Sequence, residues 1–376
     1  MEQIRGNESR LRARLRELVE IESPSDDRAA VNRAADVVVN WVLELGGEVR
    51  RHPGGSYGDV VELRFGAASH HKPVLVLGHL DTVYSARTLT TMPWREVDAE
   101  DGVRLQGPGV VDMKAGVVMA LEAIAALQQL NALNRPVMVL LNPDEEVGSE
   151  VSRPHTERLA RESDAVFVLE PAQGLAYKTA RKGVGHFELT VSGVAAHAGV
   201  DFASGHSAVL EMARLVEQVS GWTDLSKGRT VNVGVIRGGT RSNVIAAECK
   251  AEVDVRVVTM EDAGVVEEMF RGLRTHDAAC KLRVEGGINR PPMERSPGTV
   301  ALFQKAQRLA AEIGLDLQEA ATGGGSDGNF TAAIGVPTLD GMGAVGGGAH
   351  SPNEYVVAAH LVVRTALLAG MLQSGF

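Results

Sequence analysis

A chain of 376 residues can build two hydrophobic cores, because a single core stops growing at roughly 250 to 300 residues. Apolar residues make up 44% and charged residues 23%, which is typical of a globular protein and excludes intrinsic disorder. The net charge of -10 argues against a nucleic-acid partner, because phosphate binding needs a clustered excess of lysine and arginine.

The N-terminal segment and the cysteines indicate a cytoplasmic enzyme. The segment MEQIRGNESRLRARLRELVE is charged throughout, and no stretch of the chain approaches the roughly 18 apolar residues of a membrane span. Cys249 and Cys280 are too few for a disulfide framework and lack metal-ligand spacing, so we expect buried thiols. We therefore expect no membrane partner and a cytoplasmic location.

Helices and strands alternate over the first part of the chain. Apolar residues at helical spacing predict helices over 8–21 and 27–45, separated by the breaking and capping run SPSDD. The segments that follow are the β-type runs DVVELRF and KPVLVLGHL, a glycine-rich loop, a helix near 112–130, and the strands PVMVLLN and DAVFVLE. This alternation predicts an α/β domain with a largely parallel central sheet.

The pattern changes near residue 180. Four strands (GHFELTVSG, TVNVGVIRGG, IAAECKAEVDVR, CKLRVEGG) and helices at 203–220 and 261–275 follow in the order βαββαβ, which predicts a ferredoxin-like α+β domain. Alternation then resumes with a helix near 298–313, the strand VPTLDGM and a helix near 355–373. We expect a discontinuous catalytic domain, residues 1–180 and 288–376, with residues 181–287 inserted into it.

A histidine and an aspartate follow the first apolar strand in VLVLGHLDTV. His79 and Asp81 share a face, because residues i and i+2 point the same way in extended backbone. A carboxylate that accepts the second ring N–H of an imidazole fixes the tautomer of a metal-binding histidine. A polar strand end without a ligand is the alternative interpretation.

Asp112 follows GPGVV and is expected to open the next helix. An aspartate there is more often a helix cap than a ligand when it stands alone. Glycines let the backbone approach a metal closely, however, and the two oxygens of one carboxylate can bridge two ions. We therefore treat Asp112 as a candidate bridging ligand.

Further candidate ligands follow other strands. Glu145 and Glu146 come after VMVLLN, Glu170 ends FVLE, and His350 lies in the glycine-rich loop GMGAVGGGAHSPNEY. Each alone reads as a solvated loop residue, but α/β folds bind ligands where strands end, so we expect these side chains to meet. Imidazole and carboxylate without thiolate suit zinc, cobalt or manganese, and a bridging hydroxide would cancel the charge left by two divalent ions and three carboxylates.

Nine segments, taken together and in order, carry a family resemblance: GHLDTV, GPGVVDMKAG, DEEVGS, LEPA, SGVAAHAG, GGTRSNVI, DVR, GGGSDGNF and AHSPNEY. The chain resembles the di-zinc aminoacylase and carboxypeptidase family, and most closely its glutamate carboxypeptidase (carboxypeptidase G) branch. The resemblance covers nearly the whole chain.

The resemblance implies a role for each candidate. The metal ligands would be His79, Asp112, Glu146, Glu170 and His350, with Asp112 bridging two Zn²⁺ ions, His79 and Glu170 completing one site, and Glu146 and His350 the other. Glu145 would be the general base. Asp81, behind His79, is a further candidate catalytic residue because it orients that imidazole. The peptide bond after Asp112 is expected to be cis.

The resemblance also implies roles in the inserted domain, which typically forms a homodimer interface. His197 would donate to the oxyanion in a partner subunit's site, although alone it reads as a loop histidine. Asn243 and Arg256 would hold the free carboxylate of the substrate, the arginine through its bidentate fork, with a strand-end surface charge as the alternative for Arg256. The backbone of Gly324 and Gly325 would line the substrate channel.

The expected function is hydrolysis that releases a C-terminal amino acid through a metal-bridging hydroxide. Glutamate is the expected product, and N-acyl amino acids, dipeptides or folate-like conjugates are the expected substrates. Two alternatives remain: an N-acyl-amino-acid deacylase of the acetylornithine or succinyl-diaminopimelate type, and a homologue that binds metal or peptide without catalysis. The presence of Glu145 beside all five ligands argues against the second.

Overall fold

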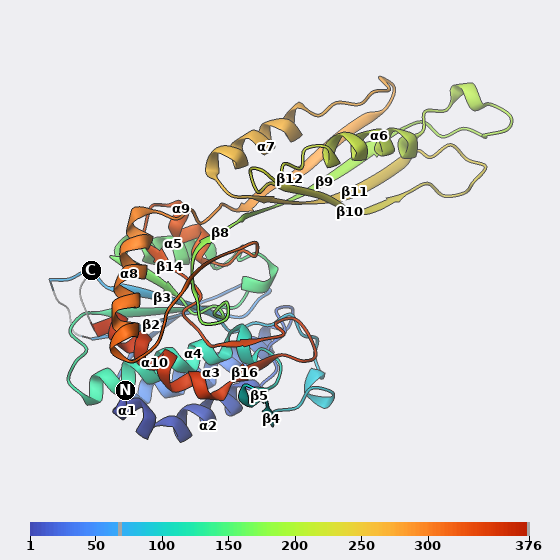
Figure 1. The fold of residues 1–376 in the computed structure, drawn as a ribbon. Coiled ribbons are helices and arrows are strands. Elements are labelled where there is room, and N and C mark those ends of the chain that lie inside the picture. The colour runs from blue at the N-terminus through green and yellow to red at the C-terminus, as the bar shows by residue number, and fades with distance from the viewer. Residues whose placement is uncertain (67–69, 374–376) are drawn as a thin grey trace. The chain divides into compact units, whose positions relative to one another are not determined.

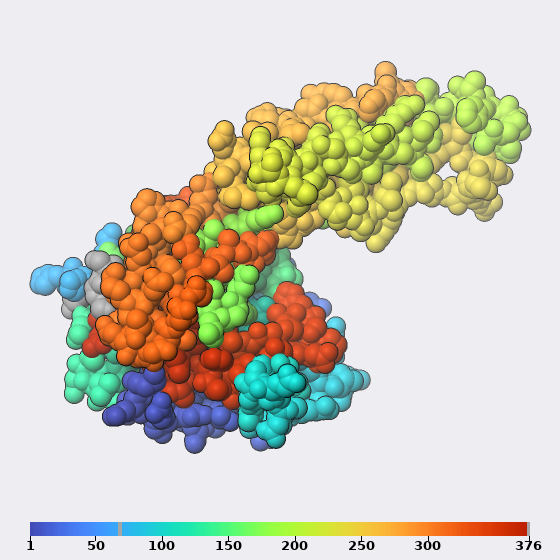
Figure 2. All heavy atoms as spheres, in the orientation of Figure 1, coloured from blue at the N-terminus to red at the C-terminus, as the bar shows by residue number. Residues whose placement is uncertain are grey.

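The computed structural model describes residues 1–66 and 70–373 and falls into two compact units. Unit 1 comprises Met1–Ala180, Arg295–Ala321 and Ser326–Phe376, and unit 2 comprises Arg181–Glu294 and Thr322–Gly325. Unit 1 is therefore built from both ends of the chain: the N-terminal helix α1 (Glu2–Gly6) packs against the C-terminal helix α10 (Ala358–Gln373). Figure 2 shows the dark-blue N-terminal atoms in the same body as the red C-terminal ones.

A sheet of six strands in the order β1-β2-β6-β3-β7-β14 forms the centre of unit 1. Its strands are β1 (Glu48–His52), β2 (Val60–Phe65), β3 (Val74–His79), β6 (Val137–Asn142), β7 (Ala165–Val168) and β14 (Thr338–Leu339). The pairings β6–β3, β3–β7 and β7–β14 are parallel, and β1–β2 and β2–β6 are antiparallel. The prediction of an α/β domain with a largely parallel sheet is confirmed.

Both faces of this sheet are covered, which explains why its inner strands are continuously apolar. Val76, Val139 and Phe167 pack into the larger core, together with residues of α2, α3, α4, α8 and α10. Leu77 and Leu140, on the opposite face, pack against α5. Figure 1 shows this layering around the sheet.

The remaining elements of unit 1 surround these layers. They are α2 (Glu8–Val19), α3 (Arg28–Glu44), β4 (Arg95–Ala99), β5 (Gly102–Gln106), α4 (Ala115–Gln129), α5 (Arg153–Glu162), β8 (Tyr177–Arg181), α8 (Pro297–Glu312), β13 (Glu319–Thr322), α9 (Gly328–Ala333), β15 (Gly346–Gly347) and β16 (Tyr355–Val357). Helix α4 is apolar on every side because it is buried along almost its whole length. None of the helices in the described part of the chain has the length and apolar character to span a bilayer.

Unit 2 is the predicted βαββαβ arrangement. Its elements are β9 (Gly183–Ser192), α6 (Ala208–Ser220), β10 (Thr230–Gly238), β11 (Glu248–Val257), α7 (Met260–Gly272) and β12 (Lys281–Arg290). The strands form an antiparallel sheet in the order β10-β11-β9-β12. Alternate residues of β9 and β11 face α6 and α7, and Phe187 stacks on Phe270 at a centroid distance of 3.7 Å. The ferredoxin-like prediction is confirmed.

Several predicted helix starts are wrong by a few residues. The helix expected from residue 203 begins at Ala208, where the Ser207 hydroxyl accepts the N–H of Leu210 and caps it. The closing helix expected from residue 355 begins at Ala358, because Tyr355–Val357 pairs with β5 as a strand. Pairing with a distant strand outweighed the local helical spacing.

A buried carboxylate on β2 ties the edge of the central sheet to its neighbours. The side chain of Glu62 is 1% exposed and accepts hydrogen bonds from His52 (3.1 Å), Arg64 (2.7 Å) and Arg158 (2.8 Å). Burial raises the pKa of Glu62, but these donors outweigh it and lower the pKa to about 2. A carboxylate whose folded pKa is depressed stabilises the fold above its unfolded pKa, and this stabilisation is lost as the pH falls from about 4.5 toward about 2.

We predict that Glu62→Gln lowers the free energy of unfolding at neutral pH by about 1 to 3 kcal/mol. The reason is that the buried NH₂ group of the glutamine would face the donors of His52, Arg64 and Arg158 in place of an acceptor. The difference from wild type should shrink as the pH falls to about 3.5. Denaturant titrations of both proteins at the two pH values measure it.

Glu162 provides a matched control. It is 45% exposed and lies 3.6 Å from Arg64 and 3.3 Å from Arg158, so Glu162→Gln should change the free energy of unfolding by less than about 1 kcal/mol. Equal losses in the two variants would show that the buried position of Glu62 carries no special weight.

Candidate active site

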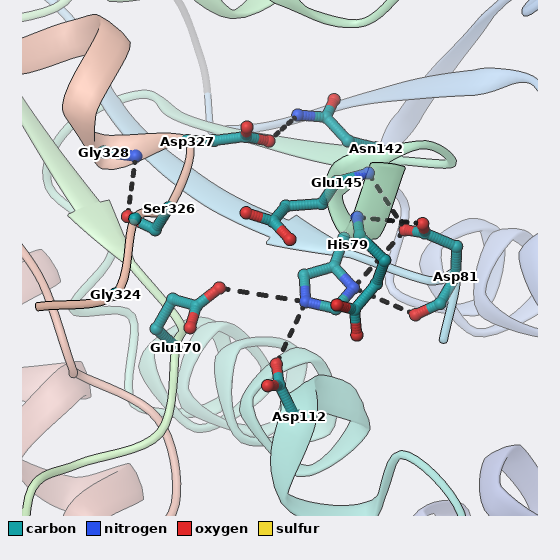
Figure 3. A network of polar contacts seen from close by, with 12 residues as sticks. His79, Asp81, Asp112, Asn142, Glu145, Glu170, Gly324, Ser326, Asp327 and Gly328 are labelled. Carbon is teal, nitrogen blue, oxygen red and sulfur yellow. Dashed lines mark hydrogen bonds and ion pairs between the residues drawn. The ribbon is translucent and has the colours of Figure 1, made fainter. Parts of the chain in front are cut away.

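His79 ends the buried strand β3, and both of its ring nitrogens face acceptors (Figure 3). Nδ1 lies 3.0 Å from the carbonyl oxygen of Asp81 and 3.4 Å from its Oδ1. Nε2 lies 3.1 Å from Oδ1 of Asp112 and 3.8 Å from Oε1 of Glu170. A proton on Nδ1 would be held by Asp81, which leaves Nε2 available as a ligand.

The carboxylate of Asp112 lies between two histidines. Its Oδ1 faces Nε2 of His79, and its Oδ2 lies 3.4 Å from Nε2 of His350. Nε2 of His350 also lies 3.3 Å from Oε2 of Glu146. Asp112 thus faces His79, which also lies near Glu170, with one oxygen, and His350, which also lies near Glu146, with the other.

Asp112 does not open a helix, so that prediction was wrong. Its backbone is extended, with φ -118° and ψ 90°, and α4 begins only at Ala115. The backbone N–H of Asp112 donates to the distant carboxylate of Glu354 at 3.0 Å. The peptide bond between Asp112 and Met113 is cis, as the family resemblance implies.

Asp81 fixes the turn that carries the two adjacent glutamates. Its Oδ1 accepts the backbone N–H of Glu145 and its Oδ2 that of Glu146, each at 3.2 Å, and Oδ2 also accepts the Ser25 hydroxyl at 2.7 Å. The Glu145 carboxylate points toward His79 and Glu170 (Figure 3). The two neighbouring glutamates therefore serve different sides of the cluster.

The cluster fits divalent metal ions. Ligand atoms of His79, Asp112 and Glu146 lie within 4.8 Å of one another, as do those of His79, Glu145 and Glu170. The donors are imidazole nitrogens and carboxylate oxygens, the set that zinc, cobalt and manganese accept. Four crowded carboxylates repel one another unless cations lie between them.

The pKa values of the cluster also show that positive charge stabilises it. Hydrogen bonds with Asp112 and Glu146 raise the pKa of His350 to about 10. Burial lowers the pKa of His79, but the contacts with Asp112 and Asp81 outweigh it, so the net pKa lies well above its usual value. Burial raises the pKa of Asp112, and the two histidines outweigh this and bring it far below its usual range.

In unit 2 the structure brings His197 and Asn243 together. The two segments pair as neighbouring backbone, with the N–H of Ala198 donating to the carbonyl of Asn243 at 3.0 Å. Both side chains are exposed, and Nδ1 of His197 accepts the N–H of Gly199 at 3.1 Å. The Nε2 side of the imidazole therefore remains the one available to a substrate.

Arg256 lies on β11 and is engaged by Asp254. The guanidinium makes a bidentate contact with that carboxylate at 2.9 and 2.8 Å and also reaches the carbonyl of Gly323 at 3.4 Å. The side chain is 31% exposed. A second carboxylate approaching Arg256 would compete with Asp254.

A buried arginine orients the predicted glycine pair. Arg181 donates to the carbonyls of Gly324 and Gly325 at 3.1 and 3.0 Å. A Cβ atom at Gly325 would lie 2.8 Å from Arg290, whereas one at Gly324 would meet nothing within 4 Å. Close approach of another chain segment therefore requires glycine at position 325 and not at position 324.

Sequence reasoning missed the polar residues that hold the ligand-bearing loops. Asp327 accepts from Asn142 and from Ser149, each at 2.5 Å, and Asp144 accepts the N–H of Val151 at 2.8 Å. The carboxylate of Glu354 accepts three backbone N–H groups from residues 109–112. Their only sequence signal was membership of the motifs NPDEEVGS, GGGSDGNF and AHSPNEY.

A groove of about 320 Å³ adjoins Glu146 within unit 1. Its other lining residues are Pro24, Ser25, Asp26, Thr82, Val83, Tyr84, Ser85 and Val147. Val83 and Val147 are 43% and 53% exposed, which is high for valine. The groove thus offers apolar contact beside the cluster together with the negative charge of Asp26.

Comparison with known proteins identifies the family. The model described as Peptidase family M20/M25/M40 matches residues 75–374. The chain belongs to this family. The predicted family resemblance is confirmed, and the chain is a metal-dependent peptidase or amidohydrolase.

Individual known proteins are similar over most of the chain. Carboxypeptidase G2 of Pseudomonas sp. (strain RS-16) is 28% identical over 95% of this chain and 87% of its own length. Acetylornithine deacetylase of Myxococcus xanthus is 28% identical over 83% of this chain and 82% of its own. Aminopeptidase PepT of Bacillus cereus has the same fold, with a TM-score of 0.80 at 21% identity over 98% of each chain.

We predict that Asp81→Asn lowers zinc affinity or turnover by about 10- to 100-fold, the usual cost of losing a residue that orients metal ligands. The Asp81 carboxylate faces two backbone N–H groups, one hydroxyl and one ring nitrogen. Each of its oxygens accepts one of the backbone N–H groups, so the NH₂ group of an asparagine must face a donor in either orientation. Zinc titration and steady-state kinetics measure the effect.

Ser25→Ala is the matched control, because it removes one hydrogen bond to Asp81 and keeps both backbone contacts. It should have a smaller effect than Asp81→Asn on both quantities. Wild-type zinc affinity and turnover in folded Asp81→Asn would contradict the orienting role.

Proposed function

We propose that this M20 enzyme is a two-zinc exopeptidase that releases a C-terminal amino acid, with glutamate as the preferred residue, from N-acyl amino acids, dipeptides or folate-like conjugates. The observation that carries the proposal is the Asp112 carboxylate facing His79 on one side and His350 on the other, with Glu145 beside them. The similarity to carboxypeptidase G2 over 95% of the chain supports the choice of substrate class.

The proposed ligands form two sets that share Asp112. His79 and Glu170 complete one set, and Glu146 and His350 complete the other. When bound, two divalent ions polarise the scissile carbonyl and lower the pKa of water toward neutrality. Cobalt or manganese fits the same donors, and zinc is the ion we propose.

Glu145 is the proposed general base. Its backbone is fixed by Asp81, and its carboxylate lies beside His79 and Glu170 in the cluster. It accepts a proton from the attacking water as the new C–O bond forms at the scissile carbonyl. It then delivers that proton to the amide nitrogen as the C–N bond breaks, which releases the amine of the C-terminal amino acid.

Residues of unit 2 are the proposed recognition groups for the substrate. Arg256 and Asn243 bind the free carboxylate, for which the Arg256 guanidinium exchanges its bidentate contact with Asp254. His197 donates from Nε2 to the carbonyl oxygen of the substrate. We propose that it does so in a homodimer formed through this unit, where Val200 and Phe202 are 82% and 70% exposed.

The groove beside Glu146 is the proposed place for the acyl part of the substrate. Its exposed valines favour an apolar group, and the charge of Asp26 disfavours a second carboxylate there.

An N-acyl-amino-acid deacylase is the second candidate. The similarity to acetylornithine deacetylase over 83% of the chain favours it, since the same bond type is cleaved with a different amine product. The two functions differ in which part of the substrate, the acyl group or the amino acid, the enzyme selects. Substrate kinetics separate them.

The experiment is a comparison of kcat/KM on the zinc-loaded enzyme for N-acyl-glutamates, dipeptides with C-terminal glutamate, and N-acetylornithine. The proposal predicts the highest kcat/KM for substrates that end in glutamate. A higher value for N-acetylornithine would establish the deacylase, and inactivity on the whole panel would contradict both.

We predict that Glu145→Gln keeps both metal ions and lowers kcat by about 10²- to 10⁴-fold, the usual contribution of a positioned base. Metal analysis and kinetics of the same preparation measure the two quantities. Glu150→Gln is the matched control, because Glu150 is an exposed glutamate in the same loop and should keep wild-type turnover. Wild-type kcat in metal-loaded Glu145→Gln would remove Glu145 from the chemistry.

A further inference from the structure

One buried carboxylate joins three loops of the candidate site. Glu354 is fully buried and lies four residues after His350, just before β16. Its Oε1 accepts the backbone N–H of Val111 at 2.7 Å and of Asp112 at 3.0 Å. Its Oε2 accepts the backbone N–H of Gly109 at 3.0 Å and lies 2.6 Å from the Tyr84 hydroxyl.

Each of these partners belongs to a loop that carries a proposed ligand or its support. Tyr84 follows the segment of His79 and Asp81, and its hydroxyl also lies 2.9 Å from the carbonyl of Ser351, next to His350. Gly109 to Asp112 is the segment that presents the bridging carboxylate. The loops after β3, before α4 and before β16 therefore meet at a single side chain.

The contacts are specific for a carboxylate. All four neighbouring groups are N–H or O–H donors, and both oxygens of Glu354 accept. A glutamine of the same shape has one accepting oxygen, so its NH₂ must face either a pair of backbone N–H groups or one N–H and the tyrosine hydroxyl. Either choice leaves at least one buried N–H unsatisfied.

The loop before α4 has little freedom to adapt to such a change. Gly109 has φ +71°, and a Cβ atom there would lie 2.6 Å from Thr82. The backbone of Asp112 is extended in a segment that leads into a helix, and its N–H has Glu354 as acceptor. Loss of that bond would let the Asp112 carboxylate move relative to His79 and His350.

We propose that Glu354 is a positioning residue that sets the spacing between the Asp112 and His350 ligands without touching metal or substrate. The inference rests on the ligand roles in the proposed function. It extends them by assigning the geometry of the site to a residue that lies outside the ligand set.

Zinc titration of the full-length, metal-free protein tests this inference without any substrate. Glu354→Gln should weaken the binding of at least one of two zinc ions by about 10- to 100-fold relative to wild type. It should also speed amide hydrogen exchange in the peptide that spans Gly109 to Asp112, because the acceptor of those N–H groups is changed.

Glu122→Gln is the matched control. Glu122 is equally buried, on α4, and its partners are the side chains of Arg10 and Arg14. It should destabilise the fold without changing zinc affinity. Equal zinc affinity in Glu354→Gln and wild type, or equal weakening in the two variants, would overturn the inference.

If Glu354→Gln does not fold, Tyr84→Phe decides. This variant removes the hydroxyl that contacts Oε2 and the Ser351 carbonyl, and it keeps the three backbone contacts of Glu354. Weaker zinc binding together with faster amide exchange in residues 109–112 supports the inference, and wild-type zinc affinity, or weaker binding with wild-type exchange there, overturns it. A wild-type protein that binds two zinc ions but cleaves none of the substrates would contradict the proposed function alone.

Discussion

Mutual repulsion among carboxylates is the constraint on which the site depends. Asp112, Glu145, Glu146 and Glu170 converge where little solvent reaches them, with Asp112 14% and Glu146 6% exposed. In such surroundings like charges raise the energy of the folded chain unless cations or protons lie between them. The raised pKa of His350, about 10, is the response of the protein's own groups to that demand, and divalent ions meet it more fully.

The rest of the fold opposes this repulsion through hydrogen bonds to the backbone of the residues that carry the carboxylates. The carboxylate of Asp81 accepts the N–H groups of Glu145 and Glu146, and that of Glu354 accepts the N–H of Asp112. Asp81 and Glu354 thus hold the backbone of the residues whose carboxylates form the cluster. The parallel strands β3, β6 and β7 supply the rigid base, because their carboxyl ends lie at one edge of the sheet.

The sequence was informative wherever chemistry and periodicity coincide. The i and i+2 relation of His79 and Asp81 placed both beside the cluster, and the apolar runs located the sheet and the βαββαβ unit. It was less informative where distant segments decide local structure. Asp112 was expected at a helix start, but its backbone is extended and its N–H donates to Glu354, far along the chain.

The same limit applies to elements that pair at long range. Strand β4 of the hairpin β4–β5 is largely exposed, and β5 pairs with the distant strand β16, and neither was among the predicted strands. The buried acceptors Asp327 and Glu354 resemble ordinary loop acids in the sequence. Only the folded chain shows that backbone or side-chain donors from other loops surround them.

The central claim is that Asp112 is shared by two metal ions. Anomalous diffraction from crystals grown with zinc measures this directly. The account predicts two peaks, one within coordination distance of Oδ1 of Asp112 and of His79, the other of Oδ2 and of His350. A single peak, or two peaks that do not both contact Asp112, would contradict it.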